Sequence, residues 1–326
     1  MIKVGLIGLG KVARLSHIPK MKATNKFEIK AAADIYPDNG TAQQFGIPEY
    51  YTDYKKILQD PEIEAVVVMS PHDCHVEHCV AAFEAGKHVL IEKPIARNLQ
   101  EAKKIMDAAA AAGTVGMIGF NERYAPANAY IKSLLEEKQL GKLLSARIDH
   151  YQNFNPAPGS WWRNKEKVGG GSVIGSGVHR LDLLRWYFGE PISVYAKAVG
   201  MPKRLEAESC VHAVIEFESG VIANFSINWA SYNYLYYEGL SISGENGLVV
   251  TGPANKLGLS QIDNGKLKDY IPPECQTMHE HFAECIKAGK QPLTSLEEGY
   301  KTLRLVRAIY KSIETGVPVS LDAVNL

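Results

Sequence analysis

The stretch "IKVGLIGLGKVA", residues 2–13, decides the fold of the first half of the chain. Its apolar start predicts a buried β-strand, and the Gly-x-Gly-x-x-Ala pattern that follows predicts a tight turn into a helix. Gly8 allows the turn, Gly10 lets the backbone approach a pyrophosphate, and Ala13 allows the helix to pack closely on the strand. The free N–H groups at the start of such a helix bind an anion. Glycine turns between strands and helices are common, so this pattern needs support from its surroundings.

Regular alternation of strands and helices continues to about residue 120. It predicts an α/β fold with a Rossmann-type, doubly wound parallel sheet and helices on both faces. Ligands of such sheets bind outside the carboxyl ends of the strands. Four segments directly follow a predicted strand and should line one crevice: Gly8-Leu9-Gly10, Asp34, Ser70-Pro71-His72 and Glu92-Lys93-Pro94. The predicted strands are residues 2–8, 27–34, 65–70, 88–92 and 115–120, and the predicted helices after the first are 53–60, 75–86 and 98–113.

Asp34 ends the second predicted strand, where a carboxylate accepts hydrogen bonds from the ribose of adenosine. Neither arginine nor lysine occurs among residues 35–38 to receive a 2′-phosphate. The sequence therefore favours NAD over NADP as the cofactor. The alternative is that Asp34 is an ordinary turn residue.

From about residue 121 the pattern changes to one helix and then to long strands. It predicts an α+β domain with a large, mostly antiparallel open sheet. We therefore expect an NAD-binding domain at residues 1–121 and a substrate-binding and oligomerisation domain at 122–326. An open sheet with one uncovered face is typical of a subunit interface, so we expect a homo-oligomer, either a dimer or a tetramer. The predicted strands are 143–154, 192–199, 209–217, 221–230, 234–243 and 246–251, and the predicted helices are 126–140, 276–289 and 295–314.

The segment "GGGSVIGSGVHRLDLLRWYFG", residues 169–189, joins a glycine-rich loop to a predicted helix. We expect the helix to begin near Gly177, with His179 in its first turn and Asp182 on the same face. A lone histidine in a helix is most often structural. This one follows a glycine-rich loop in a chain whose first half offers a cofactor crevice, so His179 is a candidate functional residue.

Composition argues against several classes of protein. The 326 residues include 36 lysines and arginines and 36 aspartates and glutamates, and no basic stripe is present, which argues against nucleic acid as a partner. The five cysteines are scattered without C-x-x-C spacing, which fits a reducing cytoplasm. No segment approaches the ~20 apolar residues that span a membrane. The N-terminal apolar run is interpreted as a strand and not as a signal peptide.

Several motifs together resemble one family. "GLGKVA", "SPHDCH", "AGKHVLIEKPIA", "GFNERYAP" and "GGGSVIGSGVHRLD" occur in the order and spacing of the glucose–fructose oxidoreductase / inositol dehydrogenase / rhizopine-catabolism (Gfo/Idh/MocA) oxidoreductases. The resemblance covers essentially the whole chain. It implies an N-terminal nicotinamide-dinucleotide domain, a C-terminal sheet domain for substrate and oligomer contacts, and oxidation or reduction of a hydroxyl or keto group on a sugar, polyol or sugar derivative.

The resemblance also implies roles for individual residues. Lys93 is similar to the family's catalytic lysine, which precedes a proline whose peptide bond is often cis, and His179 is similar to its acid/base histidine. Trp162, Arg163 and Tyr236 are side-chain types that suit a sugar ring, although packing or an interface uses them equally. The predicted cofactor contacts are Gly8, Gly10, Lys11, Val12, Asp34, Ser70, His72, His75, Glu92, Lys93 and Asn121, and the predicted substrate contacts are Arg123, Trp162, Arg163, His179 and Tyr236.

One position departs from the family pattern. Many members have an aspartate four residues before the histidine, where this chain has Gly175. We expect Gly175 to leave a space and to make the site poorer by one negative charge. Glu122 or a substrate group is a candidate to fill the gap, whereas Asp182 coexists with that aspartate in the family and is a poor replacement. Arg123 and Arg163 would then favour an anionic or bulkier sugar over free inositol.

Two other functions remain open. "HDCHVEHC", residues 72–79, contains three histidines and two cysteines and suggests a zinc site, but Cys79 lies on the apolar face of the predicted helix and no second ligand cluster exists. We therefore predict no metal. A non-catalytic NAD-binding regulatory or sensor protein is the second alternative. The presence of both Lys93 and His179 argues against it, whereas Gly175 argues for it slightly.

Overall fold

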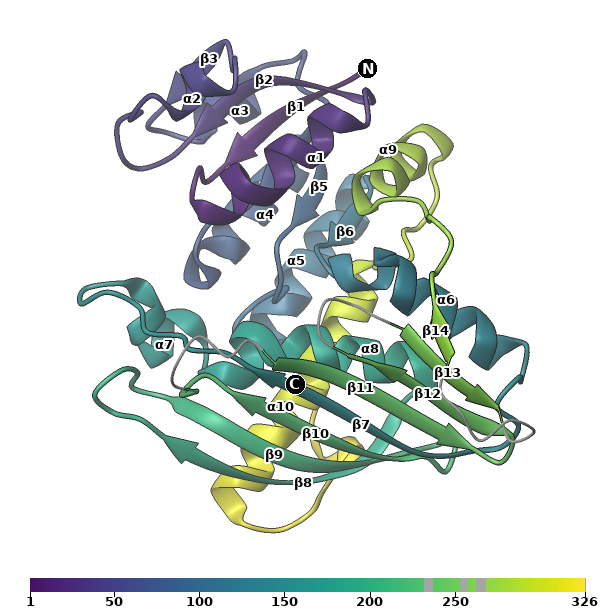
Figure 1. The fold of residues 1–326 in the computed structure, drawn as a ribbon. Helices are drawn as coiled ribbons and strands as arrows, with labels where there is room; N and C mark the ends of the chain where they lie inside the picture. The colour runs from purple at the N-terminus through teal and green to yellow at the C-terminus, as the bar shows by residue number, and fades with distance from the viewer. Residues whose placement is uncertain (232–236, 253–256, 262–267, 326) are drawn as a thin grey trace. The chain divides into compact units, whose positions relative to one another are not determined.

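The computed structural model describes residues 1–231, 237–252, 257–261 and 268–325 (Figure 1). The chain folds into two units, of which the first contains Met1–Phe120 and Gln276–Tyr300 and the second contains Asn121–Cys275 and Lys301–Leu326. The sequence suggested one boundary, between residues 121 and 122. The structure differs because the chain comes back to the first unit for residues 276–300 before it returns to the second.

The first unit contains a six-stranded sheet with the order β3-β2-β1-β4-β5-β6. All its strand pairs are parallel, which confirms the predicted doubly wound sheet. The order reverses between β1 and β4, and this switch point is where such sheets bind ligands. The short β3 has too few residues for a recognisable pattern and was not predicted. The strands are β1 Ile2–Ile7, β2 Phe27–Ala33, β3 Glu49–Tyr51, β4 Ala65–Val68, β5 His88–Ile91 and β6 Gly116–Ile118.

Helices of this unit begin and end where local chemistry dictates. The Asn98 side chain accepts a hydrogen bond from the Glu101 N–H and so caps the start of α5. Gly113, in the left-handed conformation, ends it. The segment after Gly10 forms a π-helical turn, Ala13–His17, before α1. The helices are α1 Ile18–Ala23, α2 Thr41–Gln44, α3 Lys55–Gln59, α4 His75–Glu84, α5 Leu99–Ala112 and α9 Met278–Ala288, with a 3₁₀ turn at His72–Cys74.

Helix α9 explains why residues 276–300 belong to the first unit. Thr277 and Glu280 form a capping box at its start. Its apolar face is buried, and Phe282 stacks on Phe27 of β2 with ring centroids 6.3 Å apart. Burying such a face stabilises the unit, so this distant segment is part of its core.

The second unit contains a nine-stranded sheet with the order β14-β13-β12-β11-β7-β10-β9-β8-β15. Only the β7–β10 pair is parallel among the described strands, which confirms a mostly antiparallel sheet. The strands are β7 Leu143–Tyr151, β8 Pro191–Gly200, β9 Glu208–Phe217, β10 Ile222–Asn228, β11 Tyr237–Gly244, β12 Gly247–Thr251, β13 Leu257–Gln261, β14 Lys268–Tyr270 and β15 Val319–Ser320. The helices are α6 Pro126–Glu136, α7 Lys165–Val168, α8 Val178–Phe188 and α10 Leu296–Thr315, whose first turn belongs to the first unit, and there are 3₁₀ turns at Asn121–Tyr124, Trp161–Arg163 and Leu321–Ala323.

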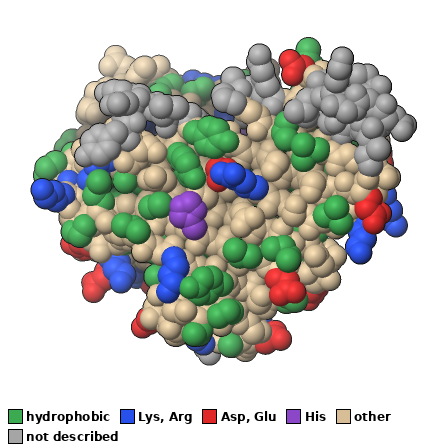
Figure 2. All heavy atoms as spheres, turned by 60° about the horizontal axis from the view of Figure 1, so that its bottom comes forward, with side chains coloured by type: hydrophobic (Ala, Val, Ile, Leu, Met, Phe, Trp, Pro, Cys, Tyr) green, Lys and Arg blue, Asp and Glu red, His purple; other side chains and the backbone are tan. Residues whose placement is uncertain are grey.

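The two faces of this sheet differ. β9 alternates between buried and exposed side chains over most of its length, as a strand with one covered face does. In Figure 2 the molecule is turned so that the bottom of Figure 1 comes forward. This view shows hydrophobic side chains scattered among polar ones. The register places five exposed apolar residues on the uncovered face: Tyr195, Val199, Val214, Ile222 and Tyr237.

In the described part of the chain, no helix is both long enough and apolar enough to cross a bilayer.

Candidate active site

The four predicted segments of the first unit do lie at one edge of its sheet. They follow β1, β2, β4 and β5, which are hydrogen-bonded neighbours running in the same direction. Two contacts link them directly. The Leu9 N–H donates to Asp34 Oδ2 at 2.8 Å, and Gly8 lies against the backbone of Met69 and Ser70. The edge is therefore a single surface made of four loops.

Gly8 and Gly10 have different reasons to be glycine. Gly8 has a φ of +95°, and a Cβ atom there would lie 2.9 Å from the Met69 carbonyl group. A Cβ at Gly10 would meet nothing within 4 Å, so the space above Gly10 is open to a ligand. Lys11 and Val12, at the start of the following helical segment, are exposed. An open glycine loop at a helix start fits a dinucleotide pyrophosphate.

Asp34 has a structural partner as well as its predicted one. Besides the bond from Leu9, its other oxygen accepts the Tyr36 N–H at 3.3 Å. A carboxylate has about four lone-pair sites, so Asp34 keeps acceptor capacity for ribose hydroxyls. The residue thus holds the glycine loop in place while it remains suited to a ribose.

His75 does not have the role that we predicted. Its side chain is fully buried, with Nδ1 2.9 Å from the Pro94 carbonyl oxygen and Nε2 3.0 Å from the Ser70 carbonyl oxygen. Each ring nitrogen thus faces a backbone carbonyl oxygen, a neutral ring donates to one of the two, and His75 lies between the ends of β4 and β5. Ser70 Oγ lies 2.8 Å from Nδ1 of His78, whose pKa burial lowers to about 4, and His72 is buried beside the His75 ring.

The Glu92-Lys93-Pro94 turn follows β5. The Lys93–Pro94 peptide bond is cis, and the Lys93 side chain is half-buried. Glu92 Oε1 lies 2.7 Å from Nε2 of His17, while Glu92 Oε2 accepts the Lys93 N–H at 3.2 Å. Burial opposes ionisation of Glu92, but the contacts with His17 and Lys93 outweigh it and lower the pKa of the carboxyl. An ionised carboxylate therefore lies next to Lys93.

In the second unit, the glycine-rich segment before His179 is held by Glu208 and Tyr310. Glu208 Oε1 accepts the N–H groups of Gly171 and Val173, both at 3.1 Å, and the Tyr310 hydroxyl at 2.9 Å. A Cβ at Gly170 would lie 2.1 Å from the Tyr310 hydroxyl oxygen, so a larger residue would displace that side chain. Burial raises the pKa of Glu208, and its hydrogen bonds oppose that rise.

His179 lies in the first turn of α8, as predicted, and is half-buried. A π-helical turn, Val173–Gly177, precedes α8 and connects it to the held glycine segment. Asn121 is exposed at the start of the 3₁₀ turn Asn121–Tyr124. Each remains a candidate for a ligand contact.

Arg123 is not available in the way that we predicted. Its guanidinium donates to both oxygens of Asp182, at 2.8 Å and 2.7 Å, and both side chains are about 98% buried or more. Thr302 adds a third contact to the Asp182 carboxylate at 3.3 Å. Breaking such a buried pair is costly because it leaves one charge uncompensated. We therefore assign Arg123 a structural role and withdraw the predicted substrate contact.

Glu122 does not fill the place opposite His179 either. Its carboxylate pairs with Arg180, which also contacts Glu238 and lies 3.0 Å from Nδ1 of His150. Glu122 is thus one of two acids around a buried arginine. The acceptor that we expected from it is already in use.

The space expected at Gly175 does not exist, because tryptophan fills it. A Cβ at Gly175 would lie 2.2 Å from Cη2 of Trp229 and 3.2 Å from Cζ3 of Trp162. Trp229 is 1% exposed, and its Nε1 donates to Ser176 Oγ at 3.0 Å. Phe154 completes this aromatic cluster, 4.3 Å from Trp229 and 5.4 Å from Trp162 between ring centroids. Gly175 is glycine because an indole ring passes over it.

Arg163 and Tyr236 are two other predicted substrate contacts. Arg163 donates to the carbonyl oxygens of Pro156 and Lys203, both at 3.1 Å, so its guanidinium holds two loops together. This use leaves little support for a contact with an anionic sugar. Tyr236 lies outside the described residues. Trp162 and His179 are partly exposed, and their substrate contacts stay predictions.

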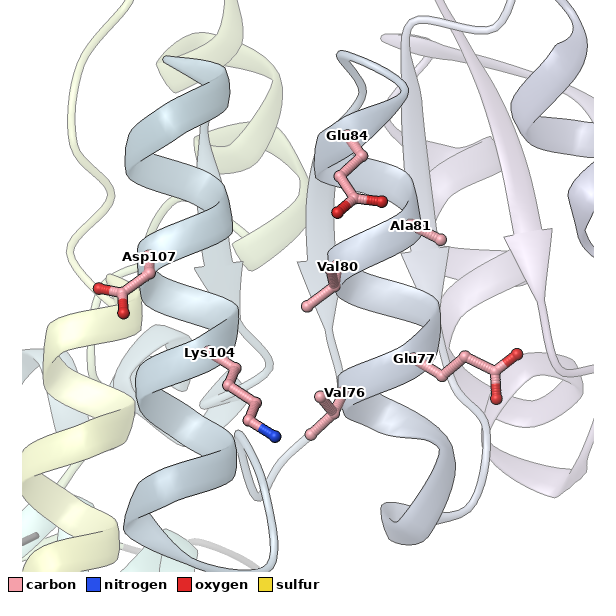
Figure 3. Close-up of a pocket in the computed structure, with 7 residues that line it drawn as sticks. All are labelled: Val76, Glu77, Val80, Ala81, Glu84, Lys104 and Asp107. Carbon is pink, nitrogen blue, oxygen red and sulfur yellow. The ribbon is translucent and has the colours of Figure 1, made fainter.

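A groove on the first unit lies away from these residues. It has a volume of about 510 Å³ and is formed on α4 and α5 (Figure 3). Val76 and Val80 contribute apolar surface, with acids at the rim. None of the predicted site residues lines it. As for metals, no group of three or more histidine, cysteine, aspartate or glutamate side chains suited to an ion occurs within the described ranges.

Sequence reasoning missed three groups of residues: His17 and His279 next to Glu92, Glu208 and Tyr310 around the glycine segment, and Trp229 over Gly175. His279 and His17 are 262 residues apart, and no local pattern connects them. The glycines at 170, 171 and 175 were a signal, because a glycine inside a helical or loop segment indicates a close approach of another group.

Two family models match the chain. The "Oxidoreductase family, NAD-binding Rossmann fold" model matches residues 2–120, and the "Oxidoreductase family, C-terminal alpha/beta domain" model matches residues 132–321. Together they cover most of the sequence and both structural units.

Individual relatives are distant but span the full length. The chain is 28% identical to 1,5-anhydro-D-fructose reductase of Ensifer adhaerens, covering 99% of each chain. It is 26% identical to myo-inositol 2-dehydrogenase of Thermotoga maritima, again covering 99% of each. Among solved structures, levoglucosan dehydrogenase in complex with NADH and levoglucosan is similar with a TM-score of 0.91, 25% identity, and coverage of 98% of this chain and 99% of that one.

The contact between Gly175 and Trp229 predicts a coupled pair. Gly175→Ala should lower the free energy of unfolding by about 1–3 kcal/mol, because overpacking displaces a buried ring. In a Trp229→Leu background the same substitution should cost clearly less. Urea denaturation of the four proteins measures the coupling. Gly10→Ala, where nothing lies within 4 Å, is the matched control and should change stability by less than about 0.5 kcal/mol. Equal costs of Gly175→Ala in both backgrounds would contradict the contact.

Proposed function

This chain belongs to the Gfo/Idh/MocA oxidoreductase family, and we propose that it transfers hydride between NAD(H) and a secondary hydroxyl or keto carbon of a sugar, polyol or sugar derivative, with Lys93 and His179 as the reacting side chains. As a member it is an NAD-dependent oxidoreductase. The observation that carries the proposal is the Lys93 turn at the carboxyl end of β5, on the same sheet edge as an open glycine loop. No observation supports the alternative of a non-catalytic sensor.

The proposed reaction requires two functions from the protein: stabilising charge on the substrate oxygen and moving the hydroxyl proton. NAD supplies the hydride acceptor when it is bound. We propose that the Lys93 ammonium donates a hydrogen bond to the substrate oxygen and stabilises the negative charge that develops on it. His179 accepts the hydroxyl proton during oxidation and returns it during reduction. The ionised Glu92 next to Lys93 favours the ammonium form of the lysine, which the first role requires.

We propose that NAD binds along the loop edge of the first unit. Gly8, Gly10, Lys11 and Val12 would receive the pyrophosphate, and Asp34 the adenosine ribose. Ser70, His72, Glu92 and Asn121 remain candidates nearer the nicotinamide. His75 would act through the backbone of Ser70 and Pro94.

For the substrate we now favour a neutral cyclic sugar over an anionic one. The two arginines that suggested an acid are bound to Asp182 and to backbone carbonyls. The partly exposed Trp162 and Phe154, which pack on the buried Trp229, offer aromatic surface, which suits the C–H face of a sugar ring. The names of two relatives, 1,5-anhydro-D-fructose reductase and levoglucosan dehydrogenase, point to the same class.

We also propose that the protein is a homo-oligomer, a dimer or tetramer, in which a second copy covers the open sheet face. The exposed Tyr195, Val199 and Val214 on β8 and β9 support this. Multi-angle light scattering on the purified protein measures the mass. The five cysteines, all free thiols, support a reducing compartment such as the cytoplasm.

The proposed roles of Lys93 and His179 predict that their removal lowers turnover more than NAD binding. Lys93→Ala and His179→Ala should each lower kcat by about 10²-fold or more, because a positioned acid/base or electrostatic group contributes that much. The Kd for NAD should change far less. Stopped-flow or steady-state NADH absorbance measures kcat, and fluorescence titration measures the Kd for NAD. A variant that keeps near wild-type turnover on the best substrate removes that residue from the mechanism.

Asp34 predicts the preference between the two nicotinamide cofactors. A 2′-phosphate next to this carboxylate brings like charges together, at a cost of several kcal/mol. NAD(H) should therefore bind at least about a hundredfold more tightly than NADP(H), since 1.4 kcal/mol corresponds to a factor of ten. Titration of both cofactors measures the ratio, and Asp34→Ser should reduce it. Equal affinities in the wild type would refute the role of Asp34.

The substrate class is tested by a panel. Anhydro sugars and glycosides, free aldoses, inositols, sugar acids and simple aliphatic alcohols are assayed with NAD, and the corresponding ketones with NADH. We expect the highest kcat/KM on a neutral cyclic sugar, because a site with polar groups discriminates against ligands that leave them unpaired. Preference for a sugar acid would contradict the structural roles assigned to Arg123 and Arg163. Preference for an aliphatic alcohol would overturn the substrate class itself.

A further inference from the structure

Glu92, His17 and His279 form a chain of hydrogen bonds inside the first unit. Nε2 of His17 lies 2.7 Å from Glu92 Oε1, and Nδ1 of His17 lies 3.1 Å from Nε2 of His279. Both histidines are 1% exposed, and their rings meet edge to face with centroids 5.1 Å apart. His17 comes from the turn before α1 and His279 from α9, so two distant parts of the chain meet at the carboxylate next to Lys93.

The distances restrict where the protons are. Glu92 Oε2 accepts the Lys93 N–H, and an ionised Glu92 needs a donor at Oε1, so Nε2 of His17 carries a hydrogen. Of the two nitrogens in the second contact, one must donate. If His17 donated from Nδ1 it would be an imidazolium, and the remaining nitrogen of a neutral His279 would be a buried N–H.

That nitrogen, Nδ1 of His279, is buried and makes no hydrogen bond within the described residues. An orphaned N–H is costly, whereas an orphaned lone pair is tolerated better. The favoured arrangement therefore has a neutral His279 donating from Nε2 to an unprotonated Nδ1 of His17. Burial lowers the pKa of His279 to about 3, in agreement with a neutral ring.

We infer that His279 is a positioning residue for the Glu92–Lys93 turn: by donating to Nδ1 of His17, it keeps His17 neutral and its Nε2–H directed at Glu92. The Glu92 carboxylate then stays ionised and fixed next to Lys93, and no positive charge on His17 offsets its negative charge. Within the described residues, Lys20 on α1 and Lys93 are the lysines whose charges act on His279 and on Glu92. The inference rests on the proposed function, because Lys93 is taken as the group that Glu92 serves.

Two variants that differ mainly in one atom group test the direction of the hydrogen bond. Gln at position 279 keeps an N–H donor near the place of Nε2, whereas Glu offers only an acceptor and forces a proton onto Nδ1 of His17. His279→Glu should lower kcat/KM about tenfold or more at the wild-type optimum. It should also move the alkaline limb of the pH profile about one unit lower, because the imidazolium cancels the anion that favours the Lys93 ammonium. His279→Gln should recover most of that loss.

Glu284→Gln, at an exposed position on the same helix α9, is the control and should leave the profile unchanged. Thermal melts show whether each variant folds. If His279→Glu and His279→Gln give the same pH profile and the same loss, the hydrogen-bond direction is irrelevant and the inference is overturned.

A second measurement uses the wild-type protein and does not depend on activity. Nitrogen-15 NMR of labelled histidine should show Nε2 of His17 protonated and its Nδ1 unprotonated from pH 6 to 9, with Nε2 of His279 protonated. An imidazolium at His17 in this range overturns the inference even if both variants fail to fold. Because this readout is independent of Lys93, a fully active Lys93→Ala variant would reject the proposed function without affecting the test of the hydrogen-bond chain.

Discussion

The close approach of Gly8 to the backbone of Met69 and Ser70 is the contact on which the first unit's ligand edge depends. It joins the ends of β1 and β4, the two strands between which the sheet order reverses. Any side chain at Gly8 would push these ends apart, both by collision and because its φ of +95° is strained for other residues. The Leu9–Asp34 bond and the His75 bridge extend the same arrangement to β2 and β5. Contacts made to the backbone, by backbone and by side chains, therefore hold this edge together, and Asp34 keeps acceptor capacity besides its bond from Leu9.

The second unit uses glycine in a different way. Around residues 170–177 the glycines are required by large side chains that lie directly against the backbone: Tyr310 at Gly170, Trp229 at Gly175 and Phe225 at Gly177. Such contacts hold the segment that leads into α8, and Glu208 accepts the N–H groups of Gly171 and Val173 within it. His179, in the first turn of that helix, therefore has a defined position, which the acid/base role proposed for it requires.

The sequence predicted architecture better than contacts. Strand–helix alternation and the glycine turn sufficed for the parallel sheet, because those patterns arise from local geometry and burial. The short β3 and α2 were not predicted, because a segment of three or four residues shows no hydrophobic periodicity. The return of residues 276–300 to the first unit also escaped, since an amphipathic helix such as α9 shows that one face is buried but not against which partner. For the same reason Arg123 and Arg163 looked like ligand groups: a charged residue near a motif does not reveal whether a carboxylate elsewhere in the chain already pairs with it.

At Gly175 the structure differs from what the sequence suggested. A missing carboxylate suggested an empty place and an excess of positive charge, but the structure puts an indole over the glycine and pairs the arginines internally. The features available to select a substrate in the second unit are therefore aromatic shape and not positive charge. An aromatic surface suits the apolar face of a ring but takes no part in proton transfer. In the first unit, by contrast, the ionised Glu92 lies next to Lys93, and His17 and His279 hold that carboxylate in place through buried hydrogen bonds.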